Sequence, residues 1–477
     1  MSVTVPVIPN LPNLLDNPSE IYRFLLTCQE NFVKDFPQII SISQSIDALD
    51  PLILLATLNL ENSVHFYWEN CRNAEAMISY GIAKSIEINQ GDRFAQSQAF
   101  IQDCFQSLIA IGEPITSLFA PRILSGFSFF DKNHPHSPFP SAFLFLPQIQ
   151  ILKKHNQFCL IVNFLLDKTV NLTLLTQQIG QQLQLLKKAQ RNELIYPVLR
   201  DRCALNLQIH PLVNLQDSVT TILKLIESNH LSKLVIAQAL DILSTEDFSI
   251  LNCLQHLRQN YADCYVFSLS NGRGNCFLGA SPERLISIQN QQLITDALAG
   301  SAPRGSTKQE DSLLANNLLQ SEKERREHQA VLEYIMQQLQ ELGLSPQRSP
   351  LKLLKLSNIQ HLWTPIYAQL KPNIHPLEII ARLHPTPAVA GVPAQVACAA
   401  IQEFENFDRS LYAAPLGWVD YHGNSEFIVG IRSALIRKNQ ARLYAGAGIV
   451  AGSDPVKELA EIELKLQALL NALNAES

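Results

Sequence analysis

The sequence predicts a protein of mixed helices and strands with a large hydrophobic core. Runs rich in aromatic and β-branched residues, such as 65–68 and 158–165, are typical of strands. Other segments place apolar residues at helical spacing, and 172–189 is the clearest of these amphipathic helices. The chain has 477 residues, of which 47% are hydrophobic and 17% charged, so it is long enough to bury such a core.

The bulk composition narrows the class of protein. The net charge of −6 gives no reason to expect nucleic acid or an anionic membrane surface as a partner. No apolar run approaches the roughly 18 residues of a membrane span, and no basic segment opens a secretory signal. Nine scattered cysteines without a C-x-x-C pair are typical of thiols in a reducing compartment. We therefore expect a cytoplasmic enzyme.

The first half of the chain alternates between the two kinds of element without recognisable chemistry. Helices are expected from Asn17 and over 93–111 and 172–189, and strands over 65–68, 76–88, 123–130, 142–147 and 158–165. The polar segment 190–206 is weakly patterned and is the best place for a soft boundary. We therefore divide the chain into a variable N-terminal half, 1–205, that contributes sheet and helices, and a catalytic region, 206–473.

The second half carries residues that suit acid–base chemistry. Lys233 stands at the start of a strand-like run, 231–240, and a hairpin is expected over 264–279. Glu283 follows Pro282 directly and has apolar neighbours on both sides, including Phe277 and Leu285. A carboxyl group among apolar residues has a raised pKa, which a general acid needs. Many glutamates lie beside apolar residues without any function, so this observation alone is weak.

Two helices bring similar pairs of carboxylates. After a small-residue loop at 295–305, a capping box at Thr307 opens a long helix that ends at Gly343 and carries Glu324 and Glu327. The last helix carries Glu458 and Glu461 at the same spacing. Two such pairs could share one hard cation, and Mg²⁺ fits better than zinc because no cysteine or paired histidine joins them. Two solvated acidic faces are the alternative.

The segment 443–455 reads as a strand, a glycine-rich turn and a helix start with Asp454 as N-cap and Pro455 in the first turn. Gly446 and Gly448 let backbone N–H groups approach an anion. The pattern G-x-G-x-x-A also fits a dinucleotide fingerprint, but that fold needs a further strand after the helix. No room remains for this strand before residue 477, so we reject the dinucleotide interpretation.

Taken in order, these segments resemble a known family. The motifs are KLVIA at 233–237, GASPE at 279–283, LAGS at 298–301, EH at 327–328, LHPTPAV at 383–389, FDR at 407–409, LYA at 411–413 and GWVD at 417–420. As an ordered set they are similar to the chorismate-utilising enzymes: isochorismate synthase, salicylate synthase, anthranilate synthase component I and aminodeoxychorismate synthase. The resemblance covers roughly residues 230–470.

The resemblance implies a fold and a set of roles. The fold is a single large α+β structure of two big antiparallel β-sheets packed together with helices outside, as in anthranilate synthase component I. Lys233 would be the base that activates water, and Glu283 the acid that protonates the departing hydroxyl. Glu327 and Glu461 would bind Mg²⁺, with Glu324 and Glu458 acting directly or through water. The implied substrate-binding residues are Gly300, Ser301, His361, Ala388, Tyr412, Arg432, Gly446, Gly448 and Lys465.

Residues 384–389 point to one branch of the family. The sequence HPTPAV is similar to isochorismate synthases, whereas amino-transferring and salicylate-forming relatives tend to place a threonine where Ala388 stands. We therefore expect a Mg²⁺-dependent isochorismate synthase that needs no glutamine amidotransferase partner and serves menaquinone or phylloquinone biosynthesis. The alternatives are a salicylate synthase, an anthranilate or aminodeoxychorismate synthase component I, and a non-catalytic chorismate-binding paralogue. Departures from the family pattern at Gln238, Ser410, Ala414 and Leu459 suggest the last.

Overall fold

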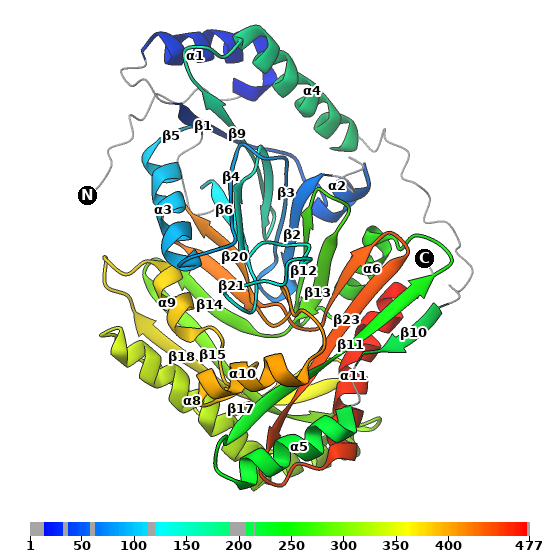
Figure 1. Cartoon of the computed structure of the whole chain (residues 1–477). Helices are drawn as coiled ribbons and strands as arrows, with labels where there is room; N and C mark the ends of the chain where they lie inside the picture. Colours follow the sequence, from blue (N-terminus) through cyan, green and yellow to red (C-terminus); the bar gives the residue numbers. More distant parts are fainter. Residues whose placement is uncertain are drawn as a thin grey trace.

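The computed structural model describes residues 14–31, 37–57, 63–112, 120–190, 207–212 and 215–474. In these ranges the chain forms two large β-sheets with helices around them (Figure 1). The sheets pack against each other: the hydroxyl of Tyr265 in one sheet donates to Glu426 in the other over 2.8 Å, and buried apolar residues of both belong to one core. The predicted α+β architecture of two packed sheets is confirmed.

The larger sheet has thirteen strands in the described part of the chain, and strands of both halves share it. Across the sheet their order is β10 (Leu207–Pro211), β11 (Lys233–Ser244), β23 (Gln440–Val450), β22 (Ser433–Arg437), β13 (Cys276–Ser281), β12 (Tyr265–Asn271), β2 (Val64–Asn70), β3 (Glu75–Tyr80), β8 (Ile149–Lys154), β9 (Gln157–Leu166), β1 (Gln38–Ser45) and β5 (Leu108–Gly112), with β19 (Gly391–Val392) paired to β11. The pair β1–β5 is parallel, and the other described pairs are antiparallel.

The smaller sheet has ten strands in the same described ranges. Their order is β16 (Gln347–Arg348), β18 (Ile359–Gln369), β15 (Gln292–Pro303), β14 (Arg284–Gln289), β21 (Ser425–Val429), β20 (Pro415–Asp420), β6 (Arg122–Phe127), β7 (Ala142–Leu146) and β4 (Lys84–Ile88), with β17 (Lys352–Lys355) paired to β18. The pair β20–β6 joins late and early segments, as β12–β2 does in the larger sheet. The two halves of the chain are therefore interleaved.

Helices cover the outside of the sheets (Figure 1). They are α1 (Pro18–Glu30), α2 (Pro51–Thr57), α3 (Arg93–Gln106), α4 (Leu172–Gln190), α5 (Leu215–Glu227), α6 (Ile250–Asn260), α7 (Lys308–Gln320), α8 (Glu322–Glu341), α9 (Pro376–Leu383), α10 (Ala394–Phe404) and α11 (Pro455–Leu473), with short 3₁₀ turns at Leu14–Asp16 and Cys71–Asn73. Helix α8 packs on β15 and α11 on β23. In the described ranges, none of the helices combines the length and the apolar character that crossing a bilayer requires.

In the first half, most predicted elements are confirmed and two are corrected. The single strand expected over 76–88 is two strands, β3 and β4, which belong to different sheets and separate at Gly81, where φ is 69°. The helix expected over 93–111 ends at Gln106, and its last residues form β5 instead. Residues 191–206 lie outside the described ranges, so the boundary at 205 stays a prediction.

In the second half, two predictions near the site are wrong. The loop expected at 295–305 is mostly part of β15, which bulges between Ala299 and Ser301 around Gly300. The helix expected over 307–343 is two helices, because Ser321 ends α7 and caps α8 by accepting the Glu324 N–H.

The glycine-rich stretch before α11 is also corrected. Gly446 and Gly448 lie within strand β23 rather than in a turn, because β11 pairs with β23 along its whole length. The turn comes after them, at Ala451 and Gly452. The predicted start of the last helix is confirmed: Asp454 accepts the Val456 N–H and Pro455 is the first helical residue.

Candidate active site

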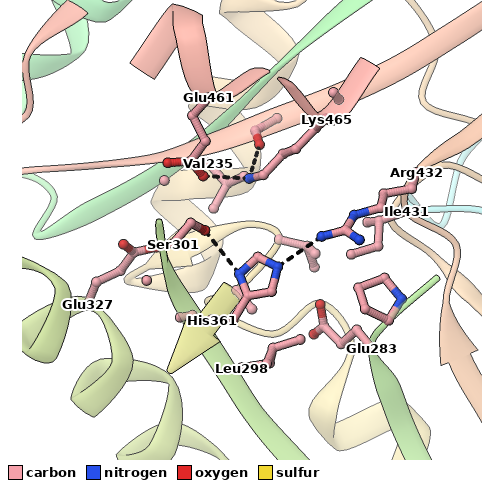
Figure 2. A pocket seen from close by; sticks show the side chains of 18 of the residues that line it. Val235, Glu283, Leu298, Ser301, Glu327, His361, Ile431, Arg432, Glu461 and Lys465 are labelled. Atoms are coloured by element: carbon pink, nitrogen blue, oxygen red, sulfur yellow. Dashed lines mark hydrogen bonds and ion pairs between the residues drawn. The ribbon is translucent and has the colours of Figure 1, made fainter. Parts of the chain in front are cut away.

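A cavity of about 720 Å³, including its opening to solvent, lies where β23, β15 and β18 meet α8 and α11 (Figure 2). Most of the residues predicted for the site line it: Glu283, Gly300, Ser301, Glu327, His361, Ala388, Tyr412, Arg432, Gly446, Gly448, Glu461 and Lys465. Small or apolar residues, which sequence reasoning did not assign, complete the lining: Val235, Pro282, Leu298, Ala299, Val389, Ile431 and Ala445. The cavity is therefore polar on some walls and apolar on others.

Lys233 lies just behind this lining. It is the first residue of β11, its side chain is 1% exposed, and its Nζ lies 2.8 Å from Oε1 of Glu327 on α8. A Cβ at Gly448 would come within 2.5 Å of that carboxylate oxygen and 3.0 Å of the Lys233 Cε, so the ion pair needs a glycine there.

Glu283 approaches the cavity from the turn between β13 and β14. The hydroxyl of Ser281 accepts its N–H over 3.2 Å, and its carbonyl accepts the Val429 N–H over 3.1 Å, so the backbone at this turn is held. Burial raises the pKa of Glu283 to about 8, although the charges of Lys233 and other nearby cations lower it in part. The side chain is therefore a protonated acid at neutral pH. Figure 2 shows Glu283 and Glu327 at opposite sides of the cavity.

A directional chain of hydrogen bonds crosses the floor of the cavity. The guanidinium of Arg432 can only donate, so His361 accepts at Nε2 over 2.9 Å, and its Nδ1 lies 3.0 Å from the Ser301 hydroxyl (Figure 2). Ser301 in turn hydrogen-bonds to Glu461. Burial, together with the charges of Arg432 and Lys465, lowers the pKa of His361 well below its ordinary value. His361 is therefore neutral, with its proton on Nδ1.

Lys465 and exposed backbone make the neighbouring wall of the cavity suited to anions. Lys465 donates to the Gly446 carbonyl over 2.9 Å and pairs with Glu461 over 2.7 Å. Strand β22 pairs only with residues of β23 up to Tyr444, so beyond this point β23 has a described strand partner on one side alone. The open side faces the cavity at Gly446 and Gly448. Tyr412 stands beside it, with its ring stacked on Tyr444 at 5.0 Å.

The four predicted metal-binding glutamates divide into two pairs. Glu327 and Glu461 line the cavity from α8 and α11. Glu324 and Glu458 lie to one side, where the ammonium of Lys323 bridges them at 3.3 and 2.7 Å. Within the described ranges, no three carboxylate, imidazole or thiol groups stand close enough together to form a preformed metal centre.

The donor set nevertheless fits Mg²⁺. This ion keeps several waters and needs only one or two protein carboxylates. Burial raises the pKa of Glu461, but Lys465 and Ser301 outweigh it, so the pKa lies below its ordinary value and the side chain is ionised. Glu327 is already paired with a cation, the Lys233 ammonium. Glu327 and Glu461 therefore bring two carboxylates to the cavity from facing helices, and a metal ion would replace their present lysine partners as the counter-charge.

A buried ion pair that sequence reasoning missed supports the site from behind. Arg409 donates to Glu405 over 2.7 Å and to the carbonyls of Val235 and Val389, while Glu405 accepts the Ala237 N–H over 2.8 Å. The pair thus ties β11, the segment with Ala388 and the segment with Tyr412 together. Arg409 belongs to the FDR motif, and a glutamate four residues earlier on a helix end was the available signal.

Comparisons with known proteins identify the family of the chain. A family model described as chorismate binding enzyme matches residues 24–474. The salicylate biosynthesis isochorismate synthase of Pseudomonas aeruginosa is 34% identical over 450 residues, which are 92% of this chain and 91% of that protein. Alignments with several other curated isochorismate synthases cover 50–54% of this chain and 55–64% of those proteins.

Two solved structures share the fold. The menaquinone-specific isochorismate synthase of Escherichia coli superposes with a TM-score of 0.74 and 27% identity, over 95% of this chain and 99% of that one. Anthranilate synthase component I of Streptococcus pneumoniae superposes with a TM-score of 0.68 and 19% identity, over 83% and 92% of the two chains. The second likeness bears on the fold alone and agrees with the predicted architecture.

Proposed function

Since the chain belongs to the family of chorismate-binding enzymes, we propose that it is an isochorismate synthase, an isomerase that interconverts chorismate and isochorismate. The observation that carries this proposal is a buried, protonated Glu283 that lines a cavity together with Arg432 and Lys465, while the buried Lys233 lies directly behind the cavity wall and contacts Glu327, which lines it. Full-length similarity to an isochorismate synthase supports it.

The cavity suits a small dianion. Chorismate carries two carboxylates, and Arg432, Lys465 and the open backbone edge of β23 offer the matching donors. Lys465 would exchange its present contact with the Gly446 carbonyl for a substrate carboxylate. The apolar residues Leu298, Val389 and Ile431 would face the ring. The substrate would then lie with its ring between Lys233 and Glu283.

The reaction then needs one base and one acid. Lys233 would take a proton from a water molecule as the water oxygen bonds to ring C2, the ring double bond shifts, and the C4 hydroxyl leaves as water with the proton of Glu283. One water enters and one leaves, so the composition is unchanged. The reverse reaction uses the same groups in exchanged roles.

To act as the base, Lys233 must be neutral, so its ion pair with Glu327 would have to separate before the reaction. Glu327 and Glu461, which both line the cavity, would hold a metal ion. We propose Mg²⁺ as this ion, with Glu324 and Glu458 as outer ligands; when bound, it would neutralise and orient a substrate carboxylate. The enzyme's own residues would carry every proton transfer.

The choice of an isochorismate synthase over the amino-transferring and salicylate-forming relatives rests on the part of the cavity wall that Ala388 forms. Ala388 and Val389 line the cavity and present no hydroxyl to the ring, so water is the nucleophile we favour and no glutamine amidotransferase is required. We propose that the product serves menaquinone or phylloquinone biosynthesis. Similarity to the menaquinone-specific enzyme of E. coli supports this, whereas the P. aeruginosa relative is named for salicylate biosynthesis.

Product identification from chorismate by chromatography tests the proposal. Purified protein with Mg²⁺ should form isochorismate, and the reaction should stop with a chelator. Release of pyruvate with salicylate would assign a salicylate synthase, and an aminated product after addition of ammonia would assign an anthranilate or aminodeoxychorismate synthase component I. Binding of chorismate without any turnover would leave a non-catalytic paralogue. The Glu283→Gln variant serves as the inactive control.

A further inference from the structure

Lys323 is a half-buried cation, with its side chain 28% exposed, that the proposed reaction does not use. It is the second residue of α8, and its Nζ lies 2.7 Å from Oε1 of Glu458 on α11 and 3.3 Å from Oε1 of Glu324. Glu458 is 3% exposed, so this bridge between two helices is largely shielded from water. Lys323 is not among the residues that line the cavity in the described part of the chain.

The other two carboxylates of the cluster already have separate cationic partners. Glu327 pairs with Lys233 at 2.8 Å and Glu461 with Lys465 at 2.7 Å. Lys465 lines the cavity, where a substrate anion would reach it, whereas the ion pairs of Lys323 in the described ranges are with Glu324 and Glu458 outside the lining. The outer pair therefore has a cation that a substrate in the cavity would not contact.

We propose that Lys323 is a built-in counter-cation that withholds Glu324 and Glu458 from direct metal binding. It is a positioning residue that acts through these carboxylates, and it leaves Glu327 and Glu461 as the direct ligands. The affinity of an oxygen site for a hard cation rises with the number of charged ligands, so Lys323 lowers the affinity of the free enzyme for Mg²⁺. The inference rests on the magnesium site of the proposed function.

The ammonium also explains how two pairs of carboxylates tolerate each other without metal. Four negative charges on facing helices repel, and the repulsion is stronger where water is partly excluded. Lys323 offsets it at the outer edge, where no substrate contact is expected. Removing its charge should therefore have two opposite effects. Without metal, the packing of α8 against α11 should be less stable. With metal, the affinity of the site for a divalent cation should be higher.

Calorimetric titration of Mg²⁺ into the whole enzyme without chorismate tests the inference. Lys323→Met should bind Mg²⁺ about tenfold more tightly than the wild type, from the loss of one charge close to a divalent ion. Lys323→Arg keeps the charge and should bind like the wild type. Lys457→Met removes an exposed charge next to Glu458 and should change the dissociation constant by less than about twofold, because solvent screens it.

Thermal unfolding gives a second readout of the same variants. Lys323→Met should melt lower than the wild type in chelator and gain more from added Mg²⁺, since the stabilisation by a ligand rises with the logarithm of its concentration divided by its dissociation constant. If Lys323→Met does not fold, Lys323→Gln removes the charge while keeping a donor for Glu458, and it should show the same tightening. Unchanged or weaker binding by these variants, with normal binding by the wild type, would overturn the inference. Absence of Mg²⁺ binding by the wild type would instead overturn the proposed magnesium site.

Discussion

Replacing Glu283 by glutamine keeps the size and shape of the side chain and removes its ionisation. In the unfolded chain this carboxyl titrates near its ordinary value of 4.5, and in the folded protein burial raises its pKa to about 8. The difference of about 3.5 corresponds, at 1.36 kcal/mol for each pKa unit, to on the order of 5 kcal/mol. This free energy is the cost of ionising Glu283 inside the fold.

The sign of the effect follows from which state holds the proton. Below pH 4.5 both states hold it, and Glu283 contributes no pH dependence. Between pH 4.5 and about 8 only the folded state holds it, so each rise in pH favours the unfolded chain. Above pH 8 the cost is complete. Relative to Glu283→Gln, the wild type should therefore lose about 4 kcal/mol of unfolding free energy between pH 5 and pH 9, since part of the total loss falls below pH 5.

Urea unfolding of both proteins at pH 5, 7 and 9 measures this loss. The difference between the two proteins isolates Glu283, because other titrating groups are common to both. Glu403→Gln, an exposed glutamate on α10, is the matched control and should follow the wild type at every pH. If Glu283→Gln and the wild type change in parallel from pH 5 to pH 9, Glu283 is not held as a neutral acid and the proposed general acid loses its basis.

Three further substitutions test other parts of the site. Lys233→Ala should abolish turnover of chorismate while calorimetry still detects binding; a retained rate would remove Lys233 from the mechanism. Gly448→Ala places a Cβ 2.5 Å from the Glu327 carboxylate and should lower kcat by at least about tenfold, whereas Gly180→Ala, whose Cβ would meet nothing within 4 Å, should leave it unchanged. Arg409→Met leaves a buried carboxylate unpaired and should cost about 3–5 kcal/mol of unfolding free energy in urea titrations; a loss below 1 kcal/mol would contradict the tie it makes between β11 and its neighbours.

Much of the site was predictable because short-range spacing determines it. The glutamates of each helix are three residues apart and must share a face, and Glu283, which has apolar neighbours in sequence, is buried in the fold. These are local properties. The contacts between distant segments are not determined by spacing. They were expected because the order of the motifs resembles that of a known family.

The errors arise where tertiary contacts override local preference. Small residues at 295–305 predict a loop, yet most of them form strand β15, which pairs with β18, and Gly300 is small because a Cβ there would crowd the backbone and side chain of Glu324 on α8. Gly446 and Gly448 likewise predict a turn, but they are small because the Tyr412 hydroxyl and the Glu327 carboxylate approach the strand there. In both cases the glycines make room for a neighbour, and no pattern within the segment distinguishes that need from a turn.

The signal for the break at Ser321 was present in the sequence. Ser321 followed by Glu324 is a helix-start pattern in the middle of an apparent helix, and the structure uses it to begin α8. Because α8 starts there, Lys323 and Glu324 lie in its first turn, beside α11. Lys323 itself was missed because its partner, Glu458, lies 135 residues away in the chain.

The position of β23 between β11 and β22 constrains when the protein can become active during its synthesis. The strand that begins with Lys233 meets its long partner only after about 200 more residues have left the ribosome. Until then β11 exposes an unpaired edge next to apolar surface, a state prone to wrong pairing and to association with other chains. Such distant pairings also slow folding. A nascent chain of this protein should therefore depend on chaperone protection until residues 440–473 emerge, and pulse-labelled synthesis should show protease resistance of the 233–244 segment appearing only at that length.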